Sequence, residues 1–393
     1  MMKKIIYIEL CNFKDYPLGG HLSFAIHLAT AMGGDIDLAG CRTDHALKER
    51  TWHKNVLVCG YEYEFYNIRN IEVSYTKPLV PARVTDYFRL KKCICEILDH
   101  KTYDIIIVQT PEVLFNVPKN YLNKVCMIAP GVGNPLAISR YSIARKFASL
   151  YDRIFFSRAS KTSVILPAAD VQAVDGFVKR SKGKLSGTRI VPFPTRYDAS
   201  IFHPSSKLDT RRLLNIPEDQ IIILTTGRLN RYKGWQLLID AFSIFHSRHE
   251  NSSLYFLGKG EDESAICEYS KAKKLSDAVV LAGVFPIDAV ANYLNASDLF
   301  VMGSFAEGWS TSLVEAVACA LPCVVTRFSS ADSLVSNGEN GYVLETRSEK
   351  DFADRMEDAL KLDAAAFMRH ANGVCSMSVQ AMREQLNRII QFE

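Results

Sequence analysis

The sequence predicts an α/β protein with two domains, each holding a mostly parallel β-sheet flanked by helices. Its 393 residues are enough for two domains of ordinary size. Short apolar runs of strand length alternate with amphipathic helical patterns in both halves. The segment 192–195 (Pro-Phe-Pro-Thr) lies between the halves and is typical of a linker, because proline fixes the path of the backbone.

The first half begins with a strand, a glycine turn and a helix. The turn is Pro-Leu-Gly-Gly at 17–20, and Gly19 and Gly20 would let a ligand approach the backbone closely. A second shaped loop, Ala-Pro-Gly-Val-Gly-Asn-Pro at 129–135, also follows a strand. Strands are predicted at 4–10, 35–41, 54–59, 104–109, 124–129, 153–156, 162–166 and 188–191, and helices at 21–32, 84–98 and 136–150.

The second half has the clearer alternation and reads as successive βα units of a Rossmann-like domain. A final helix at 379–392 carries one apolar face. Strands are predicted at 220–226, 252–257, 278–281, 298–302, 323–326 and 341–344, and helices at 234–247, 262–274, 286–295, 311–321 and 349–360.

Composition narrows the class of protein. With 48% hydrophobic and 23% charged residues, the chain is not largely disordered, and no stretch has the length of a membrane span. The apolar run after Lys3 and Lys4 is interrupted by Glu9, so it predicts a first strand and not a signal peptide. Ten scattered cysteines predict reduced thiols and a cytoplasmic protein. Four are expected in apolar cores: Cys126, Cys267, Cys319 and Cys323.

Charge is distributed unevenly. Residues 1–200 hold 28 Lys and Arg against 18 Asp and Glu, whereas the remainder holds 19 against 25. The basic half could face an anionic membrane, a phosphorylated substrate or nucleic acid, or it could simply be a solvated surface. Segment 77–92 mixes five basic with several apolar residues, which fits either a helix on an anionic bilayer or an ordinary surface helix.

The stretch 304–326 offers two carboxylates around the start of a helix. Glu307 lies in the loop after a buried strand, and Glu315 follows eight residues later inside the helix. Small residues crowd the helix start at Gly308, Ser310 and Thr311, where free backbone N–H groups favour an anion. Carboxylates that bind hydroxyl groups, beside a helix N-terminus that binds phosphate, suit a nucleotide sugar.

A second cluster follows the first strand of the second half. Gly227 ends that strand, and Arg228 and Lys233 stand before the next helix. Arginine binds phosphate with two N–H groups, and lysine adds a point charge. Gly258 and Gly283 end the next two strands, which keeps the rim open for a flat ligand such as a nucleotide.

These motifs resemble the retaining glycosyltransferases of the GT-B fold, in glycosyltransferase family 4 (glycosyltransferases group 1). The resemblance covers about 221–360 and rests on Gly-Arg-Leu-Asn-Arg-Tyr-Lys-Gly at 227–234, Leu-Gly-Lys-Gly at 257–260, Ala-Gly-Val-Phe at 282–285 and the pair Glu307 and Glu315. It implies three regions: an acceptor-binding domain at 1–195, a nucleotide-sugar domain at 196–375, and a helix at 376–393 returning to the first domain.

The resemblance also implies roles for single residues. Arg228 and Lys233 would stabilise the departing nucleoside diphosphate, and Glu307 would bind hydroxyls of the donor sugar, so these three are the expected catalytic residues. No metal and no cofactor is expected, since the two cations would replace a metal ion. Donor-binding residues would be Gly19, Gly20, Gly227, Gly258, Val284 at the base, Gly308, Trp309, Ser310, Thr311, and Glu315 at the ribose.

Two positions depart from the family pattern. Many members have glycine where Ser310 stands, which puts the sugar contacts in doubt. Many have a histidine in the first domain where Pro130 stands, so any help that this histidine gives the donor sugar would be missing or supplied by another group.

The predicted function is transfer of a sugar from a UDP- or GDP-linked donor to an acceptor hydroxyl with retained configuration. The expected acceptor is a glycan or lipid-linked glycan of bacterial surface-polysaccharide synthesis, reached in the cytoplasm or at the inner face of the cytoplasmic membrane. No nucleic-acid partner is expected. Three alternatives stay open. They are a synthase acting on a soluble sugar phosphate, a nucleotide-sugar epimerase, which would need further acid and base side chains, and a non-catalytic sugar-binding protein, which would not need the four charged residues.

Overall fold

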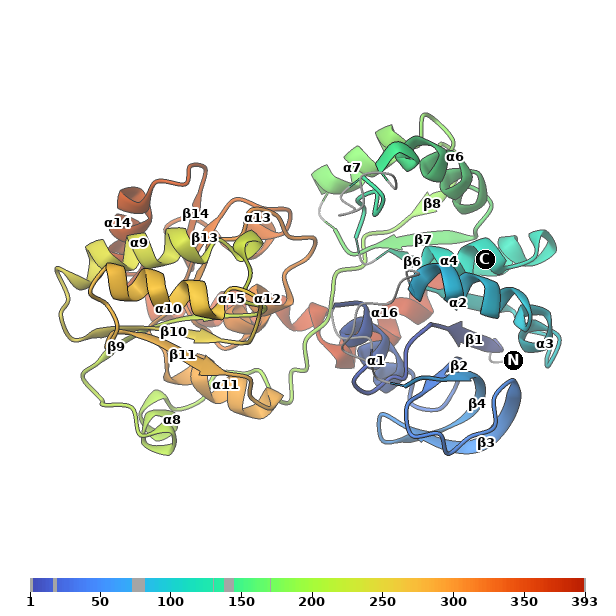
Figure 1. Cartoon of the computed structure of the whole chain (residues 1–393), viewed down its shortest axis with the longest axis horizontal. Helices are drawn as coiled ribbons and strands as arrows, with labels where there is room; N and C mark the ends of the chain where they lie inside the picture. Colours follow the sequence, from blue (N-terminus) through green and yellow to red (C-terminus); the bar gives the residue numbers. More distant parts are fainter. Residues whose placement is uncertain are drawn as a thin grey trace. The chain divides into compact units, whose positions relative to one another are not determined.

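The computed structural model describes residues 3–16, 20–72, 82–129, 131–137, 145–169 and 171–391. The chain forms two compact units, one of residues 1–196 with 379–393 and the other of residues 197–378 (Figure 1). Each unit is a layer of β-strands covered by helices on both faces. The predicted two-sheet α/β fold is therefore confirmed.

The first unit holds an eight-stranded sheet in the order β3-β4-β2-β1-β5-β6-β7-β8. All neighbours are parallel except β3 and β4, which form an antiparallel pair. The strands are β1 (Ile5–Ile8), β2 (Asp37–Arg42), β3 (Thr51–Val58), β4 (Tyr61–Asn70), β5 (Ile105–Val108), β6 (Val125–Ala129), β7 (Val164–Pro167) and β8 (Arg189–Ile190).

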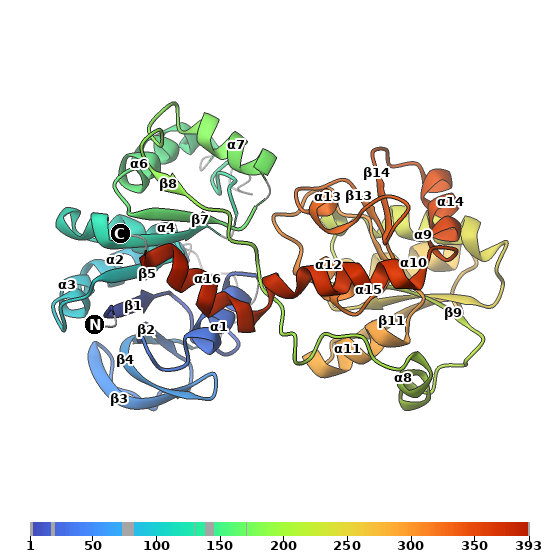
Figure 2. The ribbon, with the colours of Figure 1, turned by 180° about the vertical axis from the view of Figure 1, so that it is seen from behind.

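The helices of this unit include the C-terminal one. Helix α16 packs against α1 and buries Met382, Leu386 and Ile390 in the same apolar cluster (Figure 2). The helices are α1 (Gly20–Met32), α2 (Ala82–Lys91), α3 (Ile94–Leu98), α4 (Pro111–Asn116), α6 (Ala148–Ala159), α7 (Val171–Arg180) and α16 (Val379–Gln391), with a 3₁₀ turn η1 (Lys119–Lys124).

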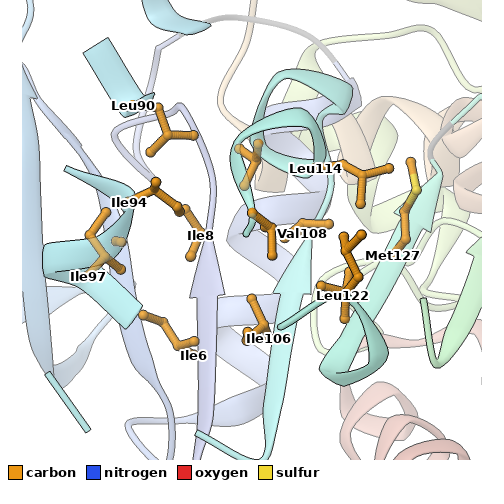
Figure 3. Packing of buried hydrophobic residues seen from close by; sticks show 14 of the residues in the cluster. Ile6, Ile8, Leu90, Ile94, Ile97, Ile106, Val108, Leu114, Leu122 and Met127 are labelled. Carbon is orange, nitrogen blue, oxygen red and sulfur yellow. The ribbon is translucent and has the colours of Figure 1, made fainter. Parts of the chain in front are cut away.

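The core on the other face of this sheet shows why β1 and β5 are unbroken apolar runs. Strands covered on both faces cannot alternate apolar and polar residues. Ile6 and Ile8 of β1 and Ile106 and Val108 of β5 point into one cluster, where Leu114 of α4 covers them (Figure 3).

The second unit holds a fully parallel six-stranded sheet in the order β11-β10-β9-β12-β13-β14. The chain runs outward from β9 through β10 to β11, then returns to the other side of β9 at β12. Open α/β sheets bind ligands at such a reversal, beyond the carboxyl ends of the strands. The strands are β9 (Ile221–Thr226), β10 (Ser252–Leu257), β11 (Val279–Gly283), β12 (Leu299–Met302), β13 (Cys323–Thr326) and β14 (Gly341–Leu344).

Helices cover both faces of this sheet as well. They are α8 (Lys207–Leu214), α9 (Trp235–His246), α10 (Glu263–Ala272), α11 (Ile287–Ala296), α12 (Thr311–Ala318), α13 (Ala331–Leu334), α14 (Glu349–Ala359) and α15 (Ala364–Gly373), with 3₁₀ turns η2 (Arg231–Lys233) and η3 (Val374–Met377). Every strand predicted in this half is present within a few residues of its expected bounds.

Two predictions were wrong, the strand at 153–156 and the burial of Cys267. Residues 153–156 form no strand but belong to α6, because a short apolar run suits a helix face as well as a strand. Of the predicted helix at 136–150, residues 145, 146 and 148–150 are helical, and residues 138–144 lie outside the described residues. Cys267 is exposed on α10, whereas Cys126, Cys319 and Cys323 are buried as expected, and none of the ten cysteines forms a disulfide.

Candidate functional site

The predicted site residues of the second unit gather at the carboxyl edge of its sheet. A cavity of about 270 Å³ opens there between the ends of β9, β10 and β11 and the first turns of α11 and α12. Its walls are mainly apolar, with Glu315 and Ser312 as the polar side chains from α12. Gly227, Gly258 and Val284, which were predicted separately from three strand ends, line the same cavity.

Glycine is required at Gly258 by two independent features. Its φ of +143° lies where side chains are strained, and a Cβ there would come within 1.9 Å of the carbonyl oxygen of Gly227. The two strand ends therefore touch through their backbones. Since no side chain can stand between them, the floor of the cavity is formed by backbone at this point.

Lys233 and Glu307 meet at the point where the strand order reverses. Lys233 Nζ lies 2.7 Å from Glu307 Oε1, and Ser304 Oγ donates to the same oxygen at 2.6 Å. The side chains are 31% and 16% exposed, so both can still reach a ligand. The sequence predicted a role for each residue, and the structure joins them into one ion pair across 74 positions.

The backbone explains why this pair forms. Asn230 caps the 3₁₀ turn η2 by accepting the N–H groups of Tyr232 and Lys233. Gly234 then adopts a φ of +67°, and a Cβ on it would lie 1.8 Å from the carbonyl oxygen of Gly303. The loops after β9 and β12 are thus in backbone contact, which brings Lys233 beside the loop that carries Glu307.

Arg228 lies at the same sheet edge but is held loosely. Its side chain is 71% exposed, and Nε lies 3.2 Å from Oε2 of the exposed Glu261. An exposed ion pair of this kind contributes little to stability, so the guanidinium can leave Glu261 at small cost. Glu261 was not among the predicted residues, because nothing in the sequence marks which carboxylate an exposed arginine meets.

Ser310 requires a correction. It is the N-cap of α12, is buried, and accepts the N–H of Leu313 through its hydroxyl. Its own N–H, which was predicted to reach the sugar or the diphosphate, donates to Ser330 Oγ at 3.0 Å. We therefore assign Ser310 to holding the helix start. Trp309 packs half-buried against the apolar core under α12.

Glu315 is the carboxyl group of the cavity. Among the described residues no hydrogen bond or ion pair to its carboxylate is found, and burial raises its pKa from 4.5 to about 8. A carboxyl group that lies in an apolar wall without a hydrogen-bond partner destabilises the fold, and a bound ligand that hydrogen-bonds to it offsets this cost. Its place beside the strand ends fits a ligand that supplies hydroxyl donors.

The raised pKa predicts how stability depends on pH. Because the folded pKa lies above the unfolded one, the contribution of Glu315 to stability is greatest below about pH 4.5 and is lost as pH rises through 8. Glu315→Gln removes this loss. We expect nearly equal stability of the two proteins at pH 5 and an advantage of about 4 kcal/mol for the variant at pH 8.5, measured by calorimetry. A constant difference across this range would contradict the assignment.

The predicted residues of the first unit are only partly described. Gly19 and Pro130 lie outside the described residues, and Gly20 is the first residue of α1. The turn of α1 that follows is tied to β5, since Gln109 Nε2 donates to the carbonyl oxygen of His21 at 2.8 Å and Tyr7 Oη donates to Gln109 Oε1 at 2.7 Å. A second cavity of about 250 Å³ opens beside His21 and Gln109.

Sequence reasoning missed Arg347, which supports the loop of Glu307. Its guanidinium lies 3.6 Å from the ring centre of Phe305 and Nη1 donates to the carbonyl oxygen of Ser304 at 3.4 Å. It follows β14, forty residues further along the chain, and no local pattern marks it. Within the described residues no cluster of three or more His, Cys, Asp or Glu is placed to hold a metal ion. Metal independence remains a prediction.

Two parallel-sheet Rossmann-like units with a ligand cavity at a strand-order reversal define the GT-B class of fold. Solved structures of this class agree over the whole chain. A sucrose-phosphate synthase from Thermosynechococcus elongatus matches with a TM-score of 0.76 at 15% identity, covering 99% of this chain and 98% of that one. Anabaena HepE in complex with UDP-glucose matches with a TM-score of 0.67 at 17% identity, covering 99% and 100%.

Residues 206–372 of this chain match the family model of the glycosyl transferases group 1. A D-inositol 3-phosphate glycosyltransferase from Paenarthrobacter aurescens is 29% identical over 174 residues. That similarity spans 43% of this chain and 43% of the relative, and therefore leaves more than half of each protein unmatched.

Proposed function

We propose that this chain is a retaining glycosyltransferase that uses a UDP- or GDP-linked sugar as donor. The observation that carries the proposal is the Lys233–Glu307 ion pair beside the cavity of Gly258 and Glu315. A cation for phosphate, a carboxylate for sugar hydroxyls and a carboxylate for ribose lie at the same edge of the sheet. The nucleoside part of the donor would occupy the cavity, with the base near Val284.

In the proposed reaction the bond between the anomeric carbon and the diphosphate oxygen breaks, and a bond to the acceptor oxygen forms on the same face of the sugar. The acceptor hydroxyl gives its proton to the departing diphosphate. Charge grows on that diphosphate as the bond breaks. Lys233 and Arg228 stabilise it, together with the positive end of the helix dipole of α12.

The ion pair also prepares the site. Lys233 and Glu307 neutralise each other at 2.7 Å, so neither charge is left unpaired at the sheet edge. When a donor arrives, its diphosphate replaces Glu307 beside Lys233, and its hydroxyls replace Lys233 beside Glu307. Ser304 keeps the carboxylate oriented throughout through its hydrogen bond.

For the acceptor we propose a glycan or a lipid-linked glycan of bacterial surface-polysaccharide synthesis, met on the cytoplasmic side of the membrane. The support is the basic first unit and its second cavity, which pairs polar groups at His21 and Gln109 with the aromatic side chains of Tyr151 and Phe155. Aromatic faces suit sugar rings, and the polar groups suit their hydroxyls. No helix in the described part of the chain is long and apolar enough to cross a bilayer.

A panel of radiolabelled UDP- and GDP-sugars tests the donor site through binding and slow hydrolysis. We expect one base and one sugar to stand out. Glu307→Ala should lose about 10- to 100-fold in hydrolysis, because an ionised hydrogen-bond partner of the sugar is removed. Glu307→Gln keeps an acceptor oxygen and should lose less.

Asp277→Ala serves as the matched control, since Asp277 is an exposed carboxylate of the same unit. Equal hydrolysis by the wild type and both Glu307 variants would refute the assignment. The anomeric configuration of the first-formed product, read by NMR, tests retention separately. A product with inverted configuration would contradict the retaining mechanism but would not affect the assignment of the donor site.

A further inference from the structure

Helix α6 carries apolar side chains on its solvent face. Phe147, just before the helix, is 52% exposed, and Leu150 and Ile154 on it are 50% and 46% exposed. Their spacing of three and four residues places them in one stripe. The opposite side of the helix buries Phe155 and Phe156 in the core of the unit. The helix therefore has two apolar faces. One packs in the core of the first unit, and the other is exposed.

The surroundings of this stripe are strongly basic. Residues 145–190 hold ten Lys and Arg against three Asp. Lys146, just before α6, and Arg153 on α6 are exposed, and Lys179 is exposed on α7. Isolated apolar side chains on a surface are ordinary, but a stripe bordered by cations on one helix is the pattern of a helix that lies in a membrane interface.

A groove of about 480 Å³ lies beside the stripe, between α6 and the turn after α7. Lysines 182 and 184 line it with Arg153 and Arg180. Arg180 is held by Asp152 at 3.2 Å and by the carbonyl oxygen of Val132 at 2.6 Å. Lys184 Nζ donates to the carbonyl oxygen of Arg153 at 2.9 Å. Lys182 is exposed and has no ion-pair partner among the described residues.

We propose that the α6 stripe (Phe147, Leu150 and Ile154) and the basic groove beside it dock the first unit on an anionic bilayer. The stripe enters the interface while the groove and the flanking cations meet lipid phosphates. Charge complementarity selects this occupant, because a stripe covered by a second copy of the chain would bring two strongly basic surfaces together. The proposal concerns binding alone and does not depend on transferase activity.

This surface differs from segment 77–92, where the sequence suggested membrane contact. Residues 77–81 lie outside the described residues. Among the α2 side chains whose burial the structure describes (85–91), the large apolar side chain that is exposed is Phe88, next to Arg89. One apolar side chain gives less area to bury than the three of α6.

Vesicle co-sedimentation of the full chain tests the proposal. We expect binding to vesicles that contain phosphatidylglycerol, and at least about ten-fold weaker binding to phosphatidylcholine alone. The triple variant Phe147→Ser, Leu150→Ser, Ile154→Ser removes the stripe and should bind anionic vesicles at least about ten-fold more weakly. Arg153→Glu with Lys182→Glu should lose binding to a similar extent.

Matched variants keep the test specific. Leu57→Ser, Leu208→Ser and Leu213→Ser remove three exposed leucines elsewhere, and Lys271→Glu with Lys274→Glu reverses two exposed lysines of the second unit. Both control variants should bind like the wild type, and circular dichroism checks the fold of every variant. The proposal is overturned if the stripe variant binds like the wild type, if neutral vesicles bind equally well, or if sedimentation shows a dimer that only the stripe variant loses. Loss through Lys91→Glu and Lys92→Glu alone would instead assign docking to α2.

Discussion

Lys233→Ala is expected to lower kcat/KM for hydrolysis of the preferred donor by about 10²- to 10³-fold. Lys233 is the cation at the strand-order reversal, and its removal takes away a charge that interacts most strongly when the diphosphate departs. Since this interaction grows in the transition state, kcat should fall more than KM rises. Steady-state kinetics with the donor that the panel identifies measures the changes in kcat and in KM separately.

Two comparisons interpret this result. Arg228→Ala should have a smaller effect, because its guanidinium is largely exposed and pairs with Glu261 outside the cavity. Lys271→Ala removes an exposed lysine of α10 and should change nothing. If Lys233→Ala raised KM alone and left kcat intact, Lys233 would serve binding and not the chemical step.

Gly258→Ala is expected to lower the free energy of unfolding of the second unit by about 3 kcal/mol or more. The added Cβ would have to occupy space already filled by the carbonyl oxygen of Gly227, at 1.9 Å, and its φ of +143° is strained for any side chain. Denaturant unfolding monitored by tryptophan fluorescence is suitable, because Trp235 and Trp309 both belong to this unit.

Gly283→Ala is the matched control for this prediction. Gly283 also has a positive φ, +88°, but no atom lies within 4 Å of the Cβ it would gain. Gly283→Ala therefore introduces the backbone strain without the steric clash. The strain alone should lower the free energy of unfolding by about 1 kcal/mol. Similar losses in the two variants would show that the contact between the ends of β9 and β10 does not determine the cavity floor.

Most of the fold could be predicted from the sequence because one sheet is parallel and the other is parallel except for the pair β3 and β4. Each buried strand is an unbroken apolar run that ends in glycine or polar residues, and the runs alternate with helices. Strands β3 and β4 were harder, since they form an antiparallel pair at the sheet edge and show no helix between them. Residues 153–156 were assigned to a strand because four residues cannot distinguish one face of a helix from a strand.

The sequence predicted which residues belong to the site but not which of them are in contact. Glu307 and Lys233 stood out because charged groups follow strands that end at one edge. Their direct ion pair depends on the backbone contact between Gly234 and Gly303, which no local pattern encodes. Ser310 was assigned to a ligand for the same reason: its partner, Ser330, comes twenty residues later and was not identifiable without the fold.

The α6 stripe was hidden for a related reason. Sequence periodicity shows that a helix has apolar residues on two sides, but only the packing shows which side the core uses. Phe155 and Phe156 face inward, so Phe147, Leu150 and Ile154 remain outside.

The central claim is that the cavity at the ends of β9, β10 and β11 holds the nucleoside diphosphate of a sugar donor. Calorimetric titration of UDP and GDP at pH 8.5, where Glu315 is largely ionised, tests it most directly. We predict that one of the two binds the wild type, that Glu315→Ala weakens this binding by about 10-fold or more through the loss of the ribose contacts, and that Asp277→Ala leaves it unchanged. Absence of binding to the wild type, or equal affinity in all three proteins, would contradict the claim.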